Sequence, residues 1–243
     1  MPTVLILGAT SDMGFAIAKK YAAEKYSLQL AGRNLAQLRP LQSDLQIRYG
    51  VECTIYPFDA MALDTHAGFY DSLPVKPDIT ICVVGYMEDN EKAIADPVET
   101  QKTIVTNFSG PVSILNVIGA DYAARKQGTI VGISSVAGLR GRQSNYIYGS
   151  AKAGFTAYLS GLRNKLYHDN VHVVTVLPGF VYTKMTADLT LPKPLTAHPE
   201  EVANVIYKAV KKKKNIVYVK WFWRWIMKII TSIPESMFKK KKL

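Results

Sequence analysis

The chain opens with the stretch Thr3-Val4-Leu5-Ile6-Leu7-Gly8-Ala9-Thr10-Ser11-Asp12-Met13-Gly14. Its first five residues form a short, apolar, β-rich run, which is typical of a buried parallel strand. A helical pattern of apolar residues follows, from Phe15 to Tyr21. A strand, a glycine-bearing turn and a helix start present backbone N–H groups and the helix dipole to an anion. The stretch therefore predicts a phosphate-binding turn, and the alternative is an ordinary turn between a strand and a helix.

Strand-like runs recur along the chain, with helical stretches between them. The predicted strands cover residues 3–7, 28–31, 52–57, 79–84, 129–133, 172–177 and 216–219, and the predicted helices cover 13–24, 34–49, 65–72, 98–126, 145–168 and 199–213. This alternation predicts an α/β fold: a Rossmann-like, doubly wound parallel sheet of about seven strands with helices on both faces. A chain of 243 residues without internal repeats fits one such unit. We assign this unit to residues 1–219 and a separate tail to residues 220–243.

A possible acid–base pair lies in the predicted helix 145–168. Tyr148 and Lys152 are four residues apart, and Ser135 and Asn107 lie thirteen and forty-one residues before the tyrosine. Residues at i and i+4 share a helix face, so phenol and ammonium can point at one substrate. A nearby cation favours the phenolate and should lower the pKa of Tyr148 from its ordinary value of about 10. The pair predicts proton transfer to a carbonyl or from an alcohol, although many Tyr-x-x-x-Lys pairs are only solvated helix faces.

The order and spacing of these motifs resemble those of the short-chain dehydrogenase/reductase family over nearly the whole chain. The resemblance implies that Ser135 holds and polarises the substrate oxygen and that Tyr148 is the general acid/base. It implies that Lys152 lowers the pKa of the tyrosine and binds the nicotinamide ribose, and that Asn107 anchors a water that relays protons to Lys152. All four catalytic positions of the family are filled.

The resemblance also implies a nicotinamide dinucleotide and the residues that hold it. Two positions depart from the family pattern: Asp12 replaces a glycine of the first turn, and only Gly85 remains of the usual Asn-Asn-Ala-Gly after the fourth strand. Asp59 matches the acid that contacts adenine. The implied cofactor-binding residues are Gly8, Thr10, Ser11, Asp12, Met13, Gly14, Arg33, Asp59, Gly85, Tyr148, Lys152, Pro178, Gly179, Val181 and Thr183.

The end of the second predicted strand indicates which cofactor is preferred. An NAD enzyme usually has a carboxylate there for the ribose 2′-hydroxyl, but no Asp or Glu lies between Ser27 and Gln42. Arg33 stands in this segment and can pair with a 2′-phosphate through its guanidinium fork. The sequence therefore favours NADPH/NADP over NAD, and the alternative is a surface arginine without a phosphate contact.

The positive charge of the chain is confined to its C-terminal end. Thirty Lys and Arg against nineteen Asp and Glu give a net charge of +11. Residues 208–243 hold twelve of the basic residues and one acid, Glu235, so residues 1–207 are neutral. A nucleic-acid binder would spread its charge over a binding face, and we expect no nucleic-acid partner. The two cysteines, Cys53 and Cys82, have no metal-ligand spacing, so we expect no metal.

The tail is apolar as well as basic. The stretch 221–233 is shorter than the roughly 20 apolar residues that span a bilayer. A basic, tryptophan-rich amphipathic helix typically lies in the membrane interface. If the tail is helical, its apolar face consists of Phe222, Trp225, Ile226, Ile229 and Ile233, and its basic face of Lys220, Arg224 and Lys228. We expect a cytoplasmic protein, peripheral on the cytoplasmic face of the membrane.

Alternatives for the tail are a contact across the interface of a homodimer or tetramer, as the resemblance implies, and an RNA-binding patch with stacked aromatics. The final residues, Lys240-Lys241-Lys242-Leu243, also match a dilysine retrieval signal in form. A plain polybasic end is the favoured interpretation of these four residues.

The long connection from Phe180 to Pro199 predicts a substrate lid over about residues 180–199, with an unstructured surface connection as the alternative. A lid close in sequence to a membrane tail suggests a hydrophobic or lipid-linked carbonyl substrate. Residues 142–154 and 226–238 resemble a bacterial branch of the family that includes the reductase of a 2-keto pentose on decaprenyl phosphate. The alternatives are a reductase of a long-chain keto-lipid such as 3-keto-sphinganine, and a non-catalytic NADPH-binding membrane adaptor.

Overall fold

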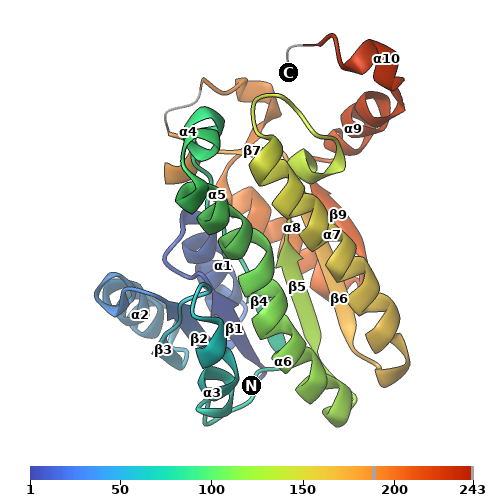
Figure 1. The fold of residues 1–243 in the computed structure, drawn as a ribbon. Coiled ribbons are helices and arrows are strands. Elements are labelled where there is room, and N and C mark those ends of the chain that lie inside the picture. The colour runs from blue at the N-terminus through green and yellow to red at the C-terminus, as the bar shows by residue number, and fades with distance from the viewer. Residues whose placement is uncertain (188–189, 242–243) are drawn as a thin grey trace.

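Seven parallel strands form one sheet in the order β3-β2-β1-β4-β5-β6-β9 (Figure 1). The structure is a computed structural model that describes residues 1–187 and 190–241. The strands are β1 Thr3–Leu7, β2 Ser27–Gly32, β3 Cys53–Pro57, β4 Ile79–Cys82, β5 Thr129–Ile133, β6 His172–Pro178 and β9 Ile216–Val219. The strand order reverses between β1 and β4, as in doubly wound folds, which bind their ligands at such a switch point. The predicted fold class and all seven predicted strands are confirmed.

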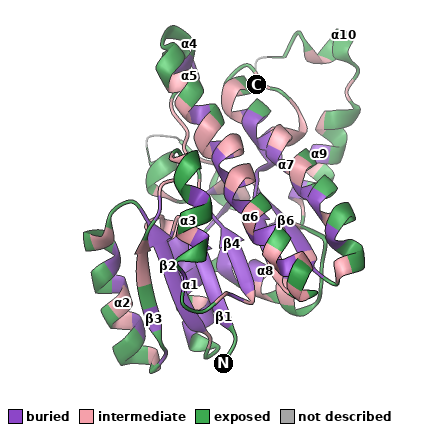
Figure 2. Cartoon of the chain, turned by 60° about the horizontal axis from the view of Figure 1, so that its bottom comes forward, coloured by how far each residue is buried: buried purple, intermediate pink, exposed green. Residues whose placement is uncertain are grey.

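Helices cover both faces of this sheet (Figure 2). One face carries α1 Asp12–Ala23, α2 Leu35–Tyr49 and α8 Pro199–Lys211, and the other carries α3 His66–Asp71, α6 Gly110–Arg125 and α7 Tyr146–Leu166. Successive residues of a strand point to opposite faces, so Val4 and Ile6 pack on one side of β1 while Leu5 and Leu7 pack on the other. Because both faces of the strand are buried, β1 is apolar from Val4 to Leu7.

The predicted helix 98–126 is interrupted in the structure. It consists of α5 Pro97–Ile104, a π-helical turn at Val105–Ser109 and α6, and it is preceded by a short helix that we did not predict, α4 Asn90–Ala95. π-Helical turns often mark functional sites, and this one contains Asn107. The run Pro97–Arg125 is long and apolar enough to cross a membrane, but apolar residues of α6 pack in the core against the sheet.

The connection after β6 has regular structure in its described part. It begins with β7 Phe180–Val181, which pairs in parallel with β8 Thr196–Ala197. Between them lie two 3₁₀ turns, Lys184–Thr186 and Lys193–Leu195. Residues 188–189 of the predicted lid lie outside the described residues, as do 242–243 of the predicted tail.

The tail forms α9 Trp223–Ser232 and α10 Glu235–Phe238, which lie at the end of the molecule where the strands have their carboxyl ends (Figure 1). The side chains of Trp223 and Met227 are only 3% and 1% exposed, and they pack in a cluster with Val136 and Leu177. Of the predicted apolar face, Trp225 and Ile229 are exposed, whereas Phe222 and Ile226 pack against this cluster. Trp223 and Met227 lie outside that face and make the most buried contacts of α9 with the body of the protein, where the ring of Trp223 lies on Gly179.

Candidate active site

The turn after β1 is shaped by two closely packed glycines and a serine cap. Gly8 has a φ of 89°, and a Cβ there would come within 3.0 Å of the backbone nitrogen of Val84. Ser11 caps helix α1, because its hydroxyl accepts a hydrogen bond from the N–H of Gly14 (3.1 Å) and donates one to the carbonyl of Gly8 (2.9 Å). A Cβ on Gly14 would come within 2.8 Å of that same carbonyl. The turn therefore presents the N-terminus of a 12-residue helix, and its geometry fits the phosphates of a dinucleotide.

Three of the four predicted catalytic side chains, Ser135, Tyr148 and Lys152, line one cavity of about 320 Å³. Ser135 follows β5, and its hydroxyl accepts a hydrogen bond from the N–H of Ala137 (3.1 Å). Tyr148 and Lys152 lie in α7, and Ser134 fixes this helix to β5 by donating to the backbone carbonyl of Lys152 (2.9 Å). The structure thus brings a hydroxyl, a phenol and an amine from two elements to one place.

Burial dominates the acid–base properties of the phenol and the amine. Lys152 is 3% exposed, and desolvation lowers its pKa to about 8. Burial likewise raises the pKa of Tyr148 to about 12, against a smaller opposing effect of Ser135. The expectation that Lys152 lowers the pKa of Tyr148 is wrong in this structure, where the ammonium nitrogen lies 5.8 Å from the centroid of the phenol ring. The phenol consequently keeps its proton near neutral pH, as a proton donor must.

The amine of Lys152 is fixed at the carboxyl end of β5. Its Nζ donates a hydrogen bond to the carbonyl of Ile133, the last residue of the strand, at 3.2 Å. This contact holds the ammonium near Gly85, which follows the neighbouring strand β4.

Asn107 lies next to this cavity but does not line it. Its side chain is fully buried and donates to the carbonyls of Tyr86 and Thr103, while its oxygen accepts from the N–H of Tyr86 (3.2 Å). The amide therefore fixes the backbone just after Gly85. A Cβ on Gly85 would lie 3.5 Å from the Asn107 oxygen and 3.8 Å from the Lys152 nitrogen. The water relay between these two side chains remains a prediction.

The predicted cofactor residues divide into two groups. Those that line the cavity with Tyr148 and Lys152 are Ser11, Asp12, Met13, Gly85, Pro178, Gly179, Val181 and Thr183, and those that lie outside it are Gly8, Thr10, Gly14, Arg33 and Asp59. Arg33 is exposed directly after β2, where Gly32 lies against the side chain of Thr10 in the phosphate turn. Asp59 follows β3, and its carboxylate accepts from the N–H of Met61 (3.0 Å). Both charged residues thus lie at the edge where the adenosine half of a dinucleotide would be expected.

Several cavity residues were not assigned a role from the sequence. The tail contributes Trp223, whose indole N–H donates to the carbonyl of Leu195 (3.1 Å). Its ring lies on the Pro178-Gly179 turn so closely that a Cβ on Gly179 would come within 2.0 Å of it. The others are Val83, Val84, Met87, Ile133, Ser134, Val136, Ala137, Arg142, Asn145, Phe180, Lys184, Met185 and Thr186. No local pattern identifies Trp223, because the turn that it covers is far away in the sequence.

The described residues 1–187 and 190–241 contain no cluster of three or more His, Cys, Asp or Glu side chains that could hold a metal ion. Both cysteines are buried free thiols, and burial raises the pKa of Cys82 to about 11.

Comparison with known proteins gives consistent results. The family of short chain dehydrogenases matches residues 2–193. An uncharacterized oxidoreductase of Mycobacterium tuberculosis is 31% identical over 240 residues, covering 98% of this chain and 96% of that protein. A ketoacyl reductase of Nostoc sp. is 29% identical over 224 residues, covering 89% of this chain and 78% of that protein. Among solved structures, a short-chain dehydrogenase from Sphingobium yanoikuyae in complex with NADPH superposes with a TM-score of 0.85 at 22% identity, covering 97% of this chain and 98% of that one.

Proposed function

The chain belongs to the short-chain dehydrogenase family, and on this premise we propose that it is an NADPH-dependent ketoreductase acting on a hydrophobic or lipid-linked carbonyl. The observation that carries the proposal is the meeting of Ser135, Tyr148 and Lys152 in one cavity that reaches the phosphate turn at Ser11–Met13. A serine hydroxyl, a protonated phenol and an ammonium are the groups that a carbonyl oxygen needs as it gains negative charge.

NADPH supplies hydride to the carbonyl carbon when it is bound. The protein's own residues act on the oxygen. Ser135 donates a hydrogen bond that strengthens as negative charge develops there. Tyr148 gives its proton to that oxygen, and the Lys152 ammonium lies 5.8 Å from the centroid of the phenol ring. Helix α7 keeps phenol and ammonium in register, and Asn107 fixes the neighbouring backbone of Tyr86.

NADPH is the cofactor that the binding residues favour. Arg33 at the end of β2 can pair with a 2′-phosphate, and no carboxylate takes its place there. The S. yanoikuyae neighbour is in complex with NADPH, which agrees with this assignment.

A hydrophobic substrate suits the apolar part of the cavity wall. Met87, Val136, Phe180, Met185 and Trp223 present apolar surface there, and such surface binds alkyl chains through the hydrophobic effect. The lid and the tail both contribute, through Met185 and Trp223.

The test is NADPH oxidation with membrane-extracted ketones and with the neutral ketone ethyl 3-oxobutanoate. Tyr148→Phe should lower kcat by roughly 10²- to 10⁴-fold, the usual contribution of general acid catalysis. NADPH affinity should stay within a few-fold, because the phenol hydroxyl acts on the substrate. Normal turnover in Tyr148→Phe would refute the mechanism. Mass spectrometry of the lipids that accumulate in cells carrying this variant would identify the substrate.

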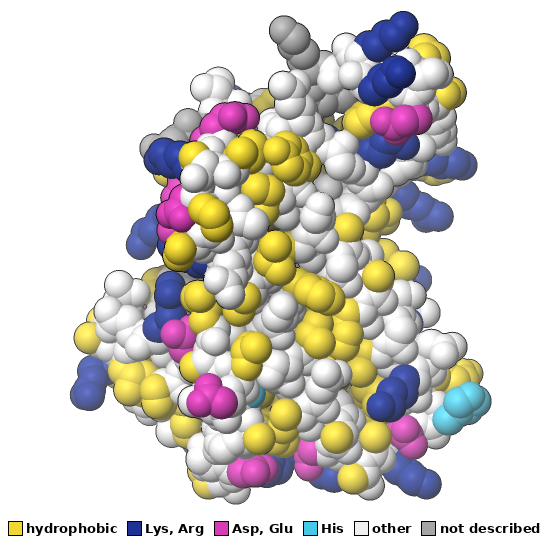
Figure 3. Space-filling view, viewed as in Figure 1, with side chains coloured by type: hydrophobic (Ala, Val, Ile, Leu, Met, Phe, Trp, Pro, Cys, Tyr) yellow, Lys and Arg dark blue, Asp and Glu magenta, His cyan; other side chains and the backbone are white. Residues whose placement is uncertain are grey.

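We also propose that the protein docks on an anionic membrane surface through α9 and the groove beside it. The side chains of Trp221, Trp225 and Ile229 recur every fourth residue and are 74%, 52% and 69% exposed. Lys and Arg side chains gather over α9 and α10 (Figure 3). An exposed apolar stripe flanked by cations suits the boundary between headgroups and acyl chains.

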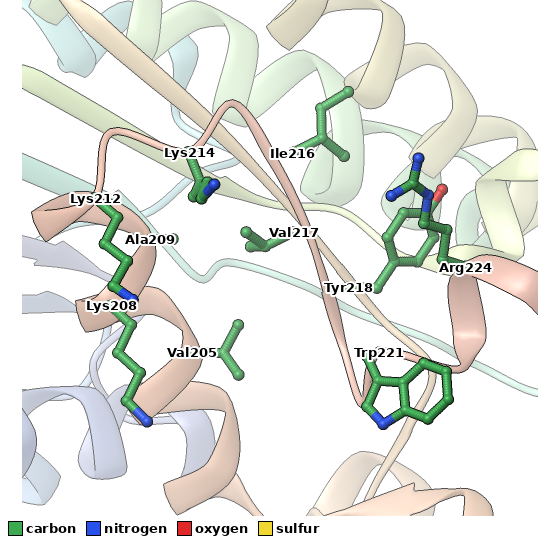
Figure 4. Close-up of a pocket in the computed structure, with 10 residues that line it drawn as sticks. All are labelled: Val205, Lys208, Ala209, Lys212, Lys214, Ile216, Val217, Tyr218, Trp221 and Arg224. Atoms are coloured by element: carbon green, nitrogen blue, oxygen red, sulfur yellow. The ribbon is translucent and has the colours of Figure 1, made fainter.

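The groove lies between α8 and the start of α9 and has a volume of about 580 Å³. Figure 4 shows Lys208 and Lys212, at the C-terminal end of α8, on one side and Trp221 and Arg224 on the other. Its cationic residues are Lys208, Lys212, Lys214 and Arg224. A phosphodiester headgroup carries the complementary charge, so the groove supports docking on anionic lipid.

Sedimentation with phosphatidylglycerol vesicles tests membrane docking. Removing residues 220–243 would expose the apolar cluster under Trp223 and Met227, so point variants are the better probe. The double variant Trp225→Glu/Ile229→Glu should release the protein from the vesicles, whereas Ile47→Glu, at an 85% exposed apolar residue of α2, should not. If the double variant still sediments but loses oligomeric mass, the tail is a subunit contact instead.

A homodimer or tetramer is a further part of the proposal. Helices α6 and α7 carry hydrophobic side chains along the front of the molecule (Figure 3) and enclose a groove of about 500 Å³ lined in part by Gly119, Ala120 and Leu162. Light scattering should give a multiple of the 27.0 kDa chain mass, and Ala120→Arg should reduce it. A monomeric wild type would contradict this part.

A further inference from the structure

Arg142 is a cation in the wall of the active-site cavity without a counter-charge. Its side chain is half-buried, and its Nε is buried with no hydrogen-bond partner. One terminal nitrogen donates to the thioether sulfur of Met227 at 3.2 Å, and a thioether is a weak acceptor. Within residues 1–187 and 190–241, none of the ion pairs includes Arg142.

Such a guanidinium is unfavourable for the fold. It carries five N–H donors in a fixed fork and stays charged in proteins, and its buried Nε–H gives up hydration without gaining a hydrogen bond in return. Desolvation accordingly lowers the pKa of Arg142. An apolar side chain of equal length would pack at least as well beside Met227 and Trp223. The missing partner is therefore to be sought in a ligand, and an anionic oxygen group fits the fork best.

Asn145 adds a second unpaired group to the same wall. Its side-chain oxygen is buried without a hydrogen-bond partner, and it lies three residues from Arg142 and three from Tyr148. A carbonyl oxygen of this kind accepts a hydrogen bond from a hydroxyl or an amine. Two unpaired buried groups, one donor and one acceptor, thus line the same cavity as the phenol that is proposed to protonate the substrate.

The cofactor is a poor candidate for this pair. The turn at Ser11–Met13 is already assigned to its pyrophosphate, and Arg33 is assigned to its 2′-phosphate. Arg142 instead contacts α9 through Met227, which is the side of the cavity that Trp223 closes.

We propose that Arg142 and Asn145 form a substrate subsite for a phosphorylated hydroxyketone, in which Arg142 binds the phosphate and Asn145 accepts a hydrogen bond from a hydroxyl group beside the ketone. This assignment rests on the proposed ketoreductase function and narrows its substrate class. A keto sugar esterified to a lipid phosphate has both groups. A long-chain amino ketone has no anionic group for Arg142.

Calorimetric titration of the protein saturated with NADP tests the subsite without requiring turnover. The probes are dihydroxyacetone phosphate and dihydroxyacetone, which share the ketone and a hydroxyl group and differ in the phosphate. Wild type should bind the phosphorylated probe about 10- to 100-fold more tightly, the range of a hydrogen bond to a charged group. Arg142→Met should abolish this preference, and Arg142→Lys should keep part of it.

Two controls separate the subsite from general effects. Arg48→Met, at an exposed arginine of α2 that pairs with Asp44, should leave the preference unchanged. Asn145→Leu should weaken the binding of both probes to a similar degree, because both contain the hydroxyl group. Thermal unfolding should show Arg142→Met at least as stable as wild type, which excludes misfolding as the cause of lost binding.

The outcomes distinguish this inference from the proposed function. Equal affinity of wild type for the two probes, or an undiminished preference in Arg142→Met, overturns the subsite. Failure of wild type to oxidise NADPH with any ketone overturns the reductase instead, and it leaves the binding result readable on its own.

Discussion

The carboxylate of Asp12 accepts a hydrogen bond from the backbone N–H of Lys184 at 2.7 Å. Asp12 belongs to the phosphate turn and Lys184 to the lid, so one side chain joins the two segments between which a dinucleotide would lie. Asp12 stands where the family usually has glycine, and the contact gives this departure a physical reason. A charged acceptor at the first 3₁₀ turn of the lid holds the lid against the body of the protein.

Asp12→Ala should therefore loosen the lid. Loss of a charge-assisted hydrogen bond should speed hydrogen exchange of the Lys184 amide by roughly 10- to 100-fold, read by mass spectrometry of the peptide that contains it. Asp12→Asn keeps an acceptor and should lie close to wild type. Unchanged exchange in the alanine variant would mean that other contacts hold the lid.

Arg33→Ala should weaken the binding of NADPH and leave the binding of NADH unchanged. Its guanidinium is exposed after β2 and is free to meet a 2′-phosphate, and such a charged contact is worth about 10- to 100-fold in affinity. Fluorescence titration of the two nucleotides gives both dissociation constants. An equal loss for NADH would assign Arg33 a structural role, and Arg39→Ala on α2 is the matched control.

Lys152→Met should raise stability while it abolishes activity. The pKa of Lys152 is about 8 in the folded protein and 10.5 in the unfolded chain, so the unfolded state binds more protons between these values and stability rises with pH there. Below pH 8 the folded wild type carries the full free-energy cost of burying the charged amine. Lys152→Met removes this cost and should therefore be more stable than wild type at pH 7 by up to about 3 kcal/mol.

Urea unfolding at several pH values measures this difference between wild type and Lys152→Met. The advantage of the variant should shrink from pH 8 and vanish above pH 10.5, where Lys152 is neutral in both states. The exposed Lys165 of the same helix offers the control, Lys165→Met. A wild type that is more stable at every pH would contradict the buried-charge account.

The same titration should appear in the kinetics. The value of kcat/KM for NADPH reports groups of the free enzyme, and it should fall as pH rises through about 8, where Lys152 loses its proton. Tyr148, with a pKa of about 12, stays protonated over this range. A profile that is flat from pH 6 to 10 would exclude a charged Lys152 from cofactor binding.

Two tryptophans of one helix should differ sharply in their effect on stability. Trp223 is 3% exposed and lies on Gly179, whereas Trp225 is 52% exposed. Trp223→Ala should cost roughly 3–5 kcal/mol as a cavity-forming change, and Trp225→Ala no more than about 0.5 kcal/mol. Urea unfolding of both variants provides the comparison. Equal costs would show that α9 does not pack on the body in solution.

The local pattern of the sequence was enough to predict most of the fold. The continuous apolar strands follow from burial on both faces, and the glycines of the first turn follow from the close approach of Gly8 to Val84 and of Gly14 to Gly8. The break at Asn107 was not predicted, because a π-helical turn has the same apolar pattern as the helices that flank it.

What the sequence alone determined is the set of groups that periodicity and spacing place together: seven strands, the phosphate turn, and a phenol and an amine on one helix face. Only the tertiary structure decided the protonation of Tyr148, the position of Trp223 over Gly179 and the isolation of Arg142 in the cavity. The reason is that strand and helix patterns are local. Desolvation and missing partners depend instead on every segment that packs around a side chain, however distant in the chain.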